Sequence, residues 1–157
     1  MRFIVNKHDI HAPFTIVIVS DSIEGKLTIV SGLGMLRILI AEDNAQVRTA
    51  LRVCLELNRS WRVCAEAENG QDTVVLAGQV KPDIVLLDYA MPGMNGVEAA
   101  RVISGAMPHC VLILFTMFAS NQLTALAKAA GISEVVSKDV GGIRALVEAI
   151  ERFSKAA

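Results

Sequence analysis

The sequence predicts an α/β fold in which five parallel strands alternate with five helices. Four unbroken apolar residues, Ile84 to Leu87, end in Asp88 and a loop with Pro and Gly, which is typical of a strand buried on both faces. Similar apolar runs recur along the chain, and segments with helical periodicity separate them. With 157 residues, 53% of them hydrophobic and 20% charged, the chain suits one compact domain.

Residues 1–35 are predicted to be an N-terminal extension, with the main domain spanning 36–157. The extension contains two β-like runs, Phe14 to Val19 and Leu27 to Val30, followed by a hinge-like stretch from Ser31 to Gly34. A lone hairpin is marginal in water. Two interpretations are open: a genuine extension, or a start site assigned too early, with Met35 as the true first residue.

From Leu36 onward, strands and helices alternate. The expected strands are Leu36 to Ala41, Trp61 to Ala65, Ile84 to Leu87, Val111 to Phe115 and Ile132 to Ser137. The expected helices are one capped by Asp43 or Asn44, then Asp72 to Gln79, Val97 to Met107, Ser120 to Ala130, and one opened by Gly141 and Gly142. This alternation favours a doubly wound sheet in the flavodoxin-like order 2-1-3-4-5, with helices on both faces.

Helical spacing also predicts which side chains face inward. The first helix should carry Arg48 and Arg52 on one face and its apolar positions on another, which are Val47, Leu51, Cys54 and Leu55. The fourth should bury its apolar positions, which are Leu123, Leu126 and Ala127, and the fifth likewise Ile143, Leu146, Val147 and Ile150.

Composition excludes several classes of function. The net charge is -1 and no basic cluster is present, so direct nucleic-acid binding is not expected. A membrane span needs about 20 apolar residues in a row, and the run Phe14 to Val19 is far shorter. Cys54, Cys64 and Cys110 lack metal-ligand spacing and are expected to be buried free thiols in a reducing cytosol. A cytoplasmic location is therefore predicted.

Polar residues follow four of the expected strands. Glu42 and Asp43 follow the first, Asp88 the third, and Thr116 and Lys138 the fourth and fifth. These ends meet at one edge of a doubly wound sheet. Three adjacent carboxylates repel one another unless a cation lies among them, and Mg²⁺ suits all-oxygen ligands. A carboxylate can attack phosphorus to give an aspartyl-phosphate, with Lys138 pairing with a phosphoryl oxygen.

Four motifs in this pattern resemble a known family. They are Ile38-Leu39-Ile40-Ala41-Glu42-Asp43, the stretch from Leu86 to Gly96 around Asp88, Leu114-Phe115-Thr116, and Val136-Ser137-Lys138-Asp139. Together they make residues 36–153 similar to the receiver domain of a two-component response regulator. The resemblance implies a phosphoprotein of a phosphorelay, not a conventional enzyme.

The resemblance also implies roles for individual residues. Asp88 would accept a phosphoryl group from a phosphohistidine on a sensor histidine kinase or a histidine phosphotransfer protein. Asp43, Asp88 and the backbone carbonyl of Ala90 would ligate Mg²⁺, with Glu42 acting through water. Thr116 would turn towards the phosphoryl group and Lys138 would pair with it. That rearrangement would remodel the face formed by the fourth helix, fifth strand and fifth helix, where a downstream protein would bind.

Two features depart from the family pattern. Many receivers carry Tyr or Phe three residues before the lysine, where this chain has Val135, so the usual coupling of threonine to an aromatic side chain is not available. The residue after the threonine is usually small, but here it is Met117, followed by Phe118. We expect switching to use the packing of Met117 or Phe118 instead.

Several functions compete. The first is a stand-alone receiver that signals through protein contacts, since the sequence stops about where the fifth helix should end. The second is a receiver-like adaptor that binds a partner independently of phosphorylation. A phosphatase of the haloacid-dehalogenase type is disfavoured because Ala90 stands where a second Asp is needed. A truncated DNA-binding regulator is the last alternative.

Overall fold

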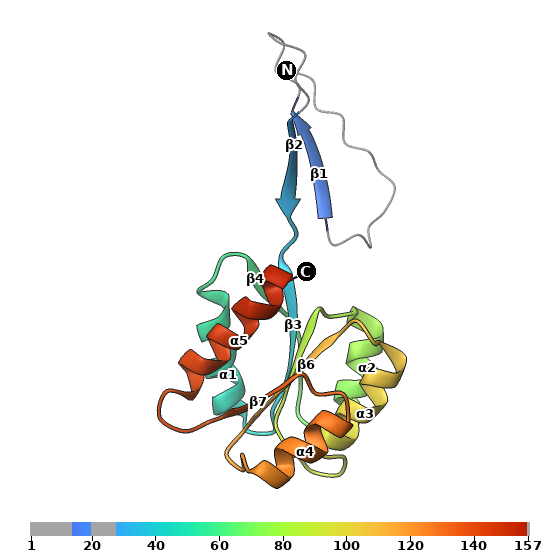
Figure 1. Ribbon diagram of the computed structural model, residues 1–157, viewed down its shortest axis with the longest axis vertical. Coiled ribbons are helices and arrows are strands. Elements are labelled where there is room, and N and C mark those ends of the chain that lie inside the picture. The colour runs from blue at the N-terminus through green and yellow to red at the C-terminus, as the bar shows by residue number, and fades with distance from the viewer. Residues whose placement is uncertain (1–13, 20–27, 157) are drawn as a thin grey trace. The chain divides into compact units, whose positions relative to one another are not determined.

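The computed structural model describes residues 14–19 and 28–156 (Figure 1). The chain divides into two compact units, Met1–Met35 and Leu36–Ala157. In the first unit, β1 (Phe14–Val19) pairs antiparallel with β2 (Thr28–Leu33). The second strand runs three residues beyond Val30, so the predicted hinge shrinks to Gly34 and Met35. Residues 1–13 and 20–27, which form most of the predicted extension, lie outside the described residues.

A five-stranded sheet forms the centre of the second unit. Its strands are β3 (Leu36–Ala41), β4 (Trp61–Ala67), β5 (Ile84–Leu87), β6 (Val111–Thr116) and β7 (Glu134–Ser137). They are all parallel and lie in the order β4-β3-β5-β6-β7. The predicted order is therefore confirmed. Three strand boundaries were wrong: β4 extends to Ala67, β6 includes Thr116, and β7 begins at Glu134 because Ile132 and Ser133 belong to the preceding loop.

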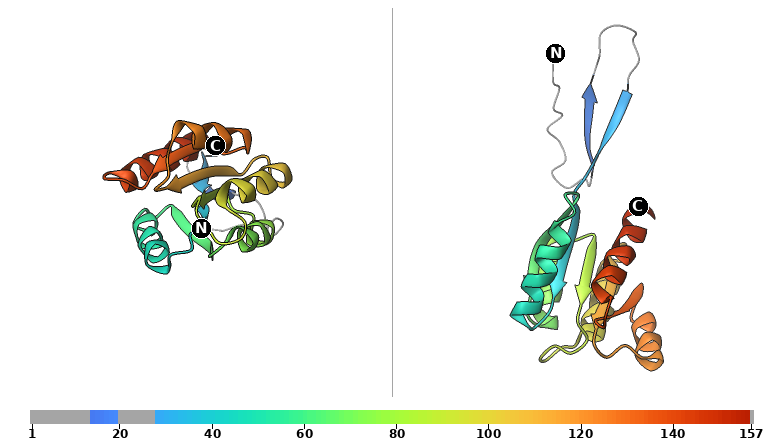
Figure 2. Two further views of the ribbon diagram at one scale, coloured as in Figure 1. Left: turned by 90° about the horizontal axis from the view of Figure 1, so that it is seen from below. Right: turned by 90° about the vertical axis from the view of Figure 1, so that its left-hand side faces the viewer.

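Five helices cover the two faces of this sheet. They are α1 (Ala45–Glu56), α2 (Gly70–Val80), α3 (Gly96–Ala106), α4 (Asn121–Ala129) and α5 (Gly142–Ala156). Asn or Ser side chains accept hydrogen bonds from the first N–H groups of α1 to α4, as N-caps do. The helices α1 and α5 lie on one face, and α2, α3 and α4 on the other (Figures 1 and 2).

The core has two layers because side chains alternate across each strand. In β3, Ile38 and Ile40 face α1 and α5, whereas Leu39 and Ala41 face the three other helices. Two predicted core positions were wrong: Leu126 of α4 and Ile143 of α5 are exposed. Helices on a sheet bury a narrower stripe than the full apolar set of the sequence, so a side chain at the stripe's margin reaches water.

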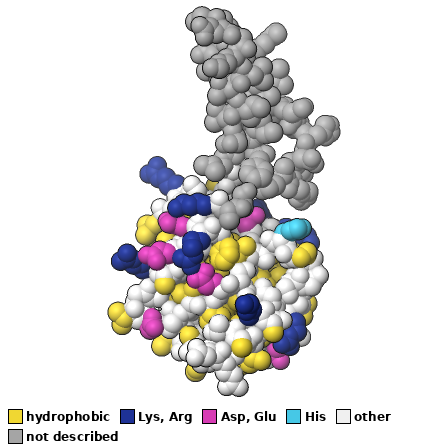
Figure 3. Space-filling model, viewed as in Figure 1, with side chains coloured by type: hydrophobic (Ala, Val, Ile, Leu, Met, Phe, Trp, Pro, Cys, Tyr) yellow, Lys and Arg dark blue, Asp and Glu magenta, His cyan; other side chains and the backbone are white. Residues whose placement is uncertain are grey.

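The surface carries mixed charges. On the face shown in Figure 3, Lys and Arg side chains are interspersed with Asp and Glu. Within the part of the chain that the structure describes, no helix is long and apolar enough to cross a membrane. Cys54, Cys64 and Cys110 are free thiols, half-buried rather than fully buried as predicted. Burial raises the pKa of Cys64, and that of Cys110 to about 12, which disfavours their reactive thiolates.

Candidate functional site

The structure brings the predicted site residues to one edge of the sheet. Glu42 directly follows β3, Asp88 follows β5, Thr116 is the last residue of β6, and Lys138 follows β7. The side chains of Glu42, Asp88 and Thr116 are buried, and Asp88 is only 7% exposed. Asp43 is exposed. Ala90, whose carbonyl is a predicted ligand, lies exposed in the loop after Asp88, and its role stays a prediction.

Backbone hydrogen bonds hold the site residues just beyond the strand ends. The Asp88 N–H donates to the Ala41 carbonyl at 2.9 Å, and the Glu42 N–H donates to the Ala67 carbonyl at 3.0 Å. The Lys138 N–H likewise donates to the Thr116 carbonyl at 2.9 Å. The ladder between neighbouring strands therefore continues for one residue, so these three positions are fixed by the sheet rather than by a flexible loop.

Three carboxylates gather in a cluster that can hold a cation. One oxygen from each of Glu42, Asp43 and Asp88 lies within 4.8 Å of the others. Mg²⁺ binds through one or two carboxylates and keeps several waters, so Asp43 and Asp88 would ligate an ion here directly while Glu42 reaches it through water. The donor set is all oxygen, as a hard divalent ion requires. The residues therefore fit Mg²⁺ in both number and chemistry.

Lys138 reaches across the sheet to this cluster. Its Nζ is hydrogen-bonded to the Glu42 carboxylate and lies 3.2 Å from Oδ1 of Asp88, and its side chain is only 12% exposed. Burial raises the pKa of Glu42, and the hydrogen bond and positive charge of Lys138 partly offset this rise. Lys138 is therefore a fixed counter-charge for two of the three carboxylates and lies beside the phosphoacceptor candidate.

Thr116 and its loop form the second side of the site. The Oγ1 of Thr116 accepts a hydrogen bond from the Phe118 N–H at 3.3 Å. The Phe118 ring meets Tyr89 edge-on with 6.4 Å between centroids, and the Tyr89 N–H donates to Asp88 Oδ1 at 2.8 Å. The segment after β6 is thus linked to the site by the contact between the rings of Phe118 and Tyr89, since the Tyr89 backbone bonds to Asp88.

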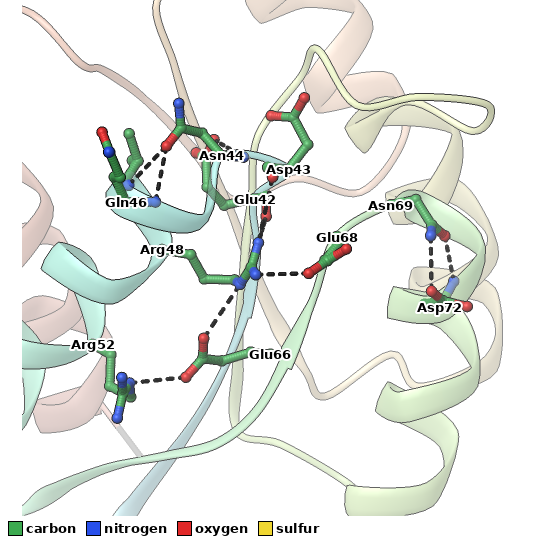
Figure 4. Close-up of polar contacts among 11 residues, drawn as sticks. Glu42, Asp43, Asn44, Gln46, Arg48, Arg52, Glu66, Glu68, Asn69 and Asp72 are labelled. Atoms are coloured by element: carbon green, nitrogen blue, oxygen red, sulfur yellow. Dashed lines mark hydrogen bonds and ion pairs between the residues drawn. The ribbon is translucent and has the colours of Figure 1, made fainter.

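Sequence reasoning missed the role of Arg48. It placed Arg48 on a different face of the first helix from the apolar residues, yet its side chain is only 11% exposed and points toward Glu42, Glu66 and Glu68 (Figure 4). The guanidinium contacts the backbone carbonyl of Glu42 and the carboxylates of Glu66 and Glu68. The sequence feature that could have revealed this role is an Arg one turn into the helix after the acid pair, together with two Glu residues at the end of the adjacent strand.

Comparison with known protein families decides the identity of the domain. The family model described as "Response regulator receiver domain" matches residues 38–151. The chain belongs to the response regulator receiver family. The receiver fold and the family resemblance predicted from the motifs are both confirmed.

Relatives of this receiver include transcriptional regulators. It is 37% identical over 106 residues to the transcriptional regulatory protein LnrK of Bacillus subtilis, covering 68% of this chain and 48% of LnrK. It is 30% identical over 118 residues to the response regulator GacA of Pseudomonas aeruginosa, covering 75% of this chain and 55% of GacA. The receiver chain thus spans about half the length of these curated relatives.

Solved structures agree with the fold of this receiver. A two-component response regulator of the LuxR family from Aurantimonas is similar with a TM-score of 0.73 and 32% identity, over 76% of this chain and 85% of that chain. The signal receiver domain of the response regulator NarL from Mycobacterium tuberculosis is similar with a TM-score of 0.70 and 26% identity, over 78% and 98%.

Family and geometry together define this receiver. Its acidic pocket of Glu42, Asp43 and Asp88 fits an aspartate phosphoacceptor and is typical of the Mg²⁺ site of receivers. The family implies a cognate histidine kinase and a role in a two-component system. The domain is not a conventional enzyme.

Proposed function

We propose that this receiver accepts a phosphoryl group on Asp88 from a phosphohistidine and acts as a stand-alone element that signals through protein contacts. The observation that carries the proposal is the position of Asp88. Its carboxylate lies at once in the three-carboxylate cluster and beside Lys138 Nζ. Metal ligands and a fixed ammonium around one carboxylate provide the positioning and charge stabilisation that phosphoryl transfer needs.

The transfer forms one bond and breaks another. An Asp88 carboxylate oxygen attacks phosphorus, the bond from phosphorus to the donor's imidazole nitrogen breaks, and that nitrogen keeps the electron pair. Asp43, Asp88 and the Ala90 carbonyl would hold Mg²⁺, with Glu42 acting through water, and the ion would supply neutralisation of the phosphoryl oxygens. The ammonium of Lys138, which lies beside Glu42 and Asp88, would pair with a phosphoryl oxygen.

Thr116 supplies the link to the output surface. In this proposal the Thr116 side chain rotates to bring its hydroxyl to the phosphoryl group, which carries Oγ1 away from the Phe118 N–H that it now accepts from. Phe118 then shifts against Tyr89, and the β6–α4 loop moves with it. Phe118 is 60% exposed, so this movement changes the surface beside α4, β7 and α5, where we place the downstream protein partner.

The decisive experiment for this function is incubation with acetyl phosphate and Mg²⁺, followed by intact-mass measurement. We expect a phosphate adduct on the native chain and none on Asp88→Asn, because the amide cannot attack phosphorus. Asp139→Asn, at an exposed position beyond Lys138, is the matched control and should keep the adduct. An unmodified native chain that still folds and binds Mg²⁺ would favour the phosphorylation-independent adaptor.

The proposed switch gives a second expected result. Adding a phosphoryl mimic with Mg²⁺ should shift the amide resonances of Phe118 and Tyr89 as well as that of Thr116, because these residues are linked by the hydrogen bond and ring contact described above. In Phe118→Ala, the shifts in the β6–α4 loop beyond Thr116 should shrink, while those at Asp88 and at Tyr89, whose N–H donates to Asp88 Oδ1, remain. Unchanged amides at Thr116, Phe118 and Val135 would show that the loop does not switch.

A further inference from the structure

The guanidinium of Arg48 joins the acid-bearing loop to the neighbouring strand end. Its Nη1 donates to the Glu42 carbonyl at 2.6 Å and lies 3.5 Å from the Asp43 carbonyl, at the outer limit of a hydrogen bond. Its Nη2 is 2.8 Å from Glu68 and its Nε 3.3 Å from Glu66 (Figure 4). One side chain of α1 therefore ties the loop between β3 and α1 to the end of β4.

The peptides that Arg48 holds are those that carry the acid pair. The preceding peptide, between Ala41 and Glu42, is anchored to the sheet on both sides, because the Glu42 N–H donates to Ala67 and the Ala41 carbonyl accepts from the Asp88 N–H. The Asn44 N–H donates to the Glu42 carboxylate rather than to the sheet, and its side chain caps α1. The orientation of the peptide between Glu42 and Asp43, and with it the direction of the Asp43 carboxylate, therefore depends on the contact with Arg48.

We infer that Arg48 is a positioning residue for Mg²⁺: its forked guanidinium fixes the peptides of Glu42 and Asp43 so that their carboxylates converge with Asp88. The inference rests on the proposed function, because it assigns to Arg48 the support of that metal site. Mg²⁺ tolerates little departure from octahedral geometry, so a small rotation of the Asp43 peptide would lower the affinity of the site for the ion.

The effect comes from geometry rather than from net charge. Glu66 and Glu68 neutralise the guanidinium, so it adds little net positive charge to the acidic cluster. A single ammonium can make one of these contacts, but it cannot hold the carbonyl and both carboxylates as a planar fork does. Arg48→Lys therefore tests whether the fork itself is needed.

Arg52 provides a matched control. It lies one turn further along α1 and pairs with the same Glu66, with its Nε 2.9 Å from Oε1. Its side chain is 43% exposed, and its ion pair is to Glu66, not to the loop between β3 and α1 (Figure 4). Arg52→Met removes the same charge from the same helix and leaves the contacts of Arg48 with the loop in place.

The test is the Mg²⁺ dissociation constant of the full chain, measured by calorimetric titration at fixed pH and ionic strength. Loss of a residue that orients metal ligands typically costs 10–100-fold in affinity, so we expect Arg48→Met to bind at least about tenfold more weakly. The Mg²⁺ affinity of Arg48→Lys should lie between those of Arg48→Met and the native chain. Arg52→Met should stay within about twofold of the native chain, because an exposed ion pair contributes little.

Each outcome decides the inference. Native-like Mg²⁺ affinity in Arg48→Met, or an equal loss in Arg52→Met, would overturn the positioning role and leave the proposed function intact. Should Arg48→Met fail to fold, native-like affinity in Arg48→Lys overturns it. Absence of Mg²⁺ binding by the native chain would overturn the proposed function and this inference with it. A loss confined to the Arg48 variants supports the inference.

Discussion

Replacing Lys138 with Met is expected to strengthen Mg²⁺ binding while weakening phosphorylation. The Lys138 ammonium contacts Glu42 and lies 3.2 Å from Asp88, so it competes with the ion for both carboxylates. Two unit charges about 4 Å apart at a protein surface repel by about 4 kcal/mol, and relief of a third of that energy corresponds to about a tenfold gain in affinity. The phosphoryl group loses its ammonium partner, so the yield of phosphate adduct should fall.

The same substitution should destabilise the metal-free domain. It leaves the buried carboxylates of Glu42 and Asp88 without their counter-charge, and breaking such a pair costs about 3 kcal/mol. Urea unfolding without Mg²⁺ measures this loss, which should shrink when Mg²⁺ is added because the ion replaces the ammonium.

The loss of stability in Lys138→Met should depend on pH with a defined sign. Burial raises the pKa of Glu42 above 4.5 in the native protein, and Lys138 counteracts that rise, so the variant's pKa is higher still. A carboxyl whose folded pKa exceeds its unfolded value favours the folded state at low pH and loses this contribution as pH rises through the folded pKa. The difference in the free energy of unfolding between the variant and the native chain should therefore be larger near about pH 8 than near about pH 5.

Lys128→Met is the control for both measurements, because it also replaces a lysine with methionine but at an exposed position of α4. It should leave the Mg²⁺ affinity and the free energy of unfolding nearly unchanged. Weaker Mg²⁺ binding in Lys138→Met would show that the ammonium does not compete with the ion, contrary to the geometry of the metal-free site.

Gly96→Ala is expected to cause a large loss of stability near the site. Gly96 begins α3, and a Cβ at this position would lie 2.1 Å from the backbone carbonyl oxygen of Asp88 and 3.2 Å from Leu114. Backbone cannot yield as a flexible side chain can, so either α3 or Asp88 moves. We expect a loss of about 3 kcal/mol in the free energy of unfolding, together with weaker phosphorylation.

Gly105→Ala is the matched control in the same helix. Nothing lies within 4 Å of the Cβ that it would add, and the position is exposed. Because Ala favours a helix over Gly, this variant should be more stable by about 0.5–1 kcal/mol. Native-like stability in Gly96→Ala would contradict the close approach of α3 to Asp88.

The sequence by itself determined the sheet and the edge at which the site lies. Buried parallel strands require unbroken apolar runs such as Ile84–Leu87, and these runs alternate with helical periods, so element type and order follow from local patterns. The polar residues Asp88, Thr116 and Lys138 stand where those runs end. Because parallel strands share one carboxyl edge, their convergence could be predicted without coordinates.

Only the tertiary structure decided which of these groups touch. Lys138 and Glu42 are 96 residues apart, and their contact depends on the spacing of strands and on the rotamer of a long side chain. The inward position of Arg48 and the outward position of Leu126 were decided in the same way. Periodicity assigns a side chain to a face of its helix, but the neighbouring elements decide how far that face is covered and which distant carbonyl or carboxylate completes its contacts.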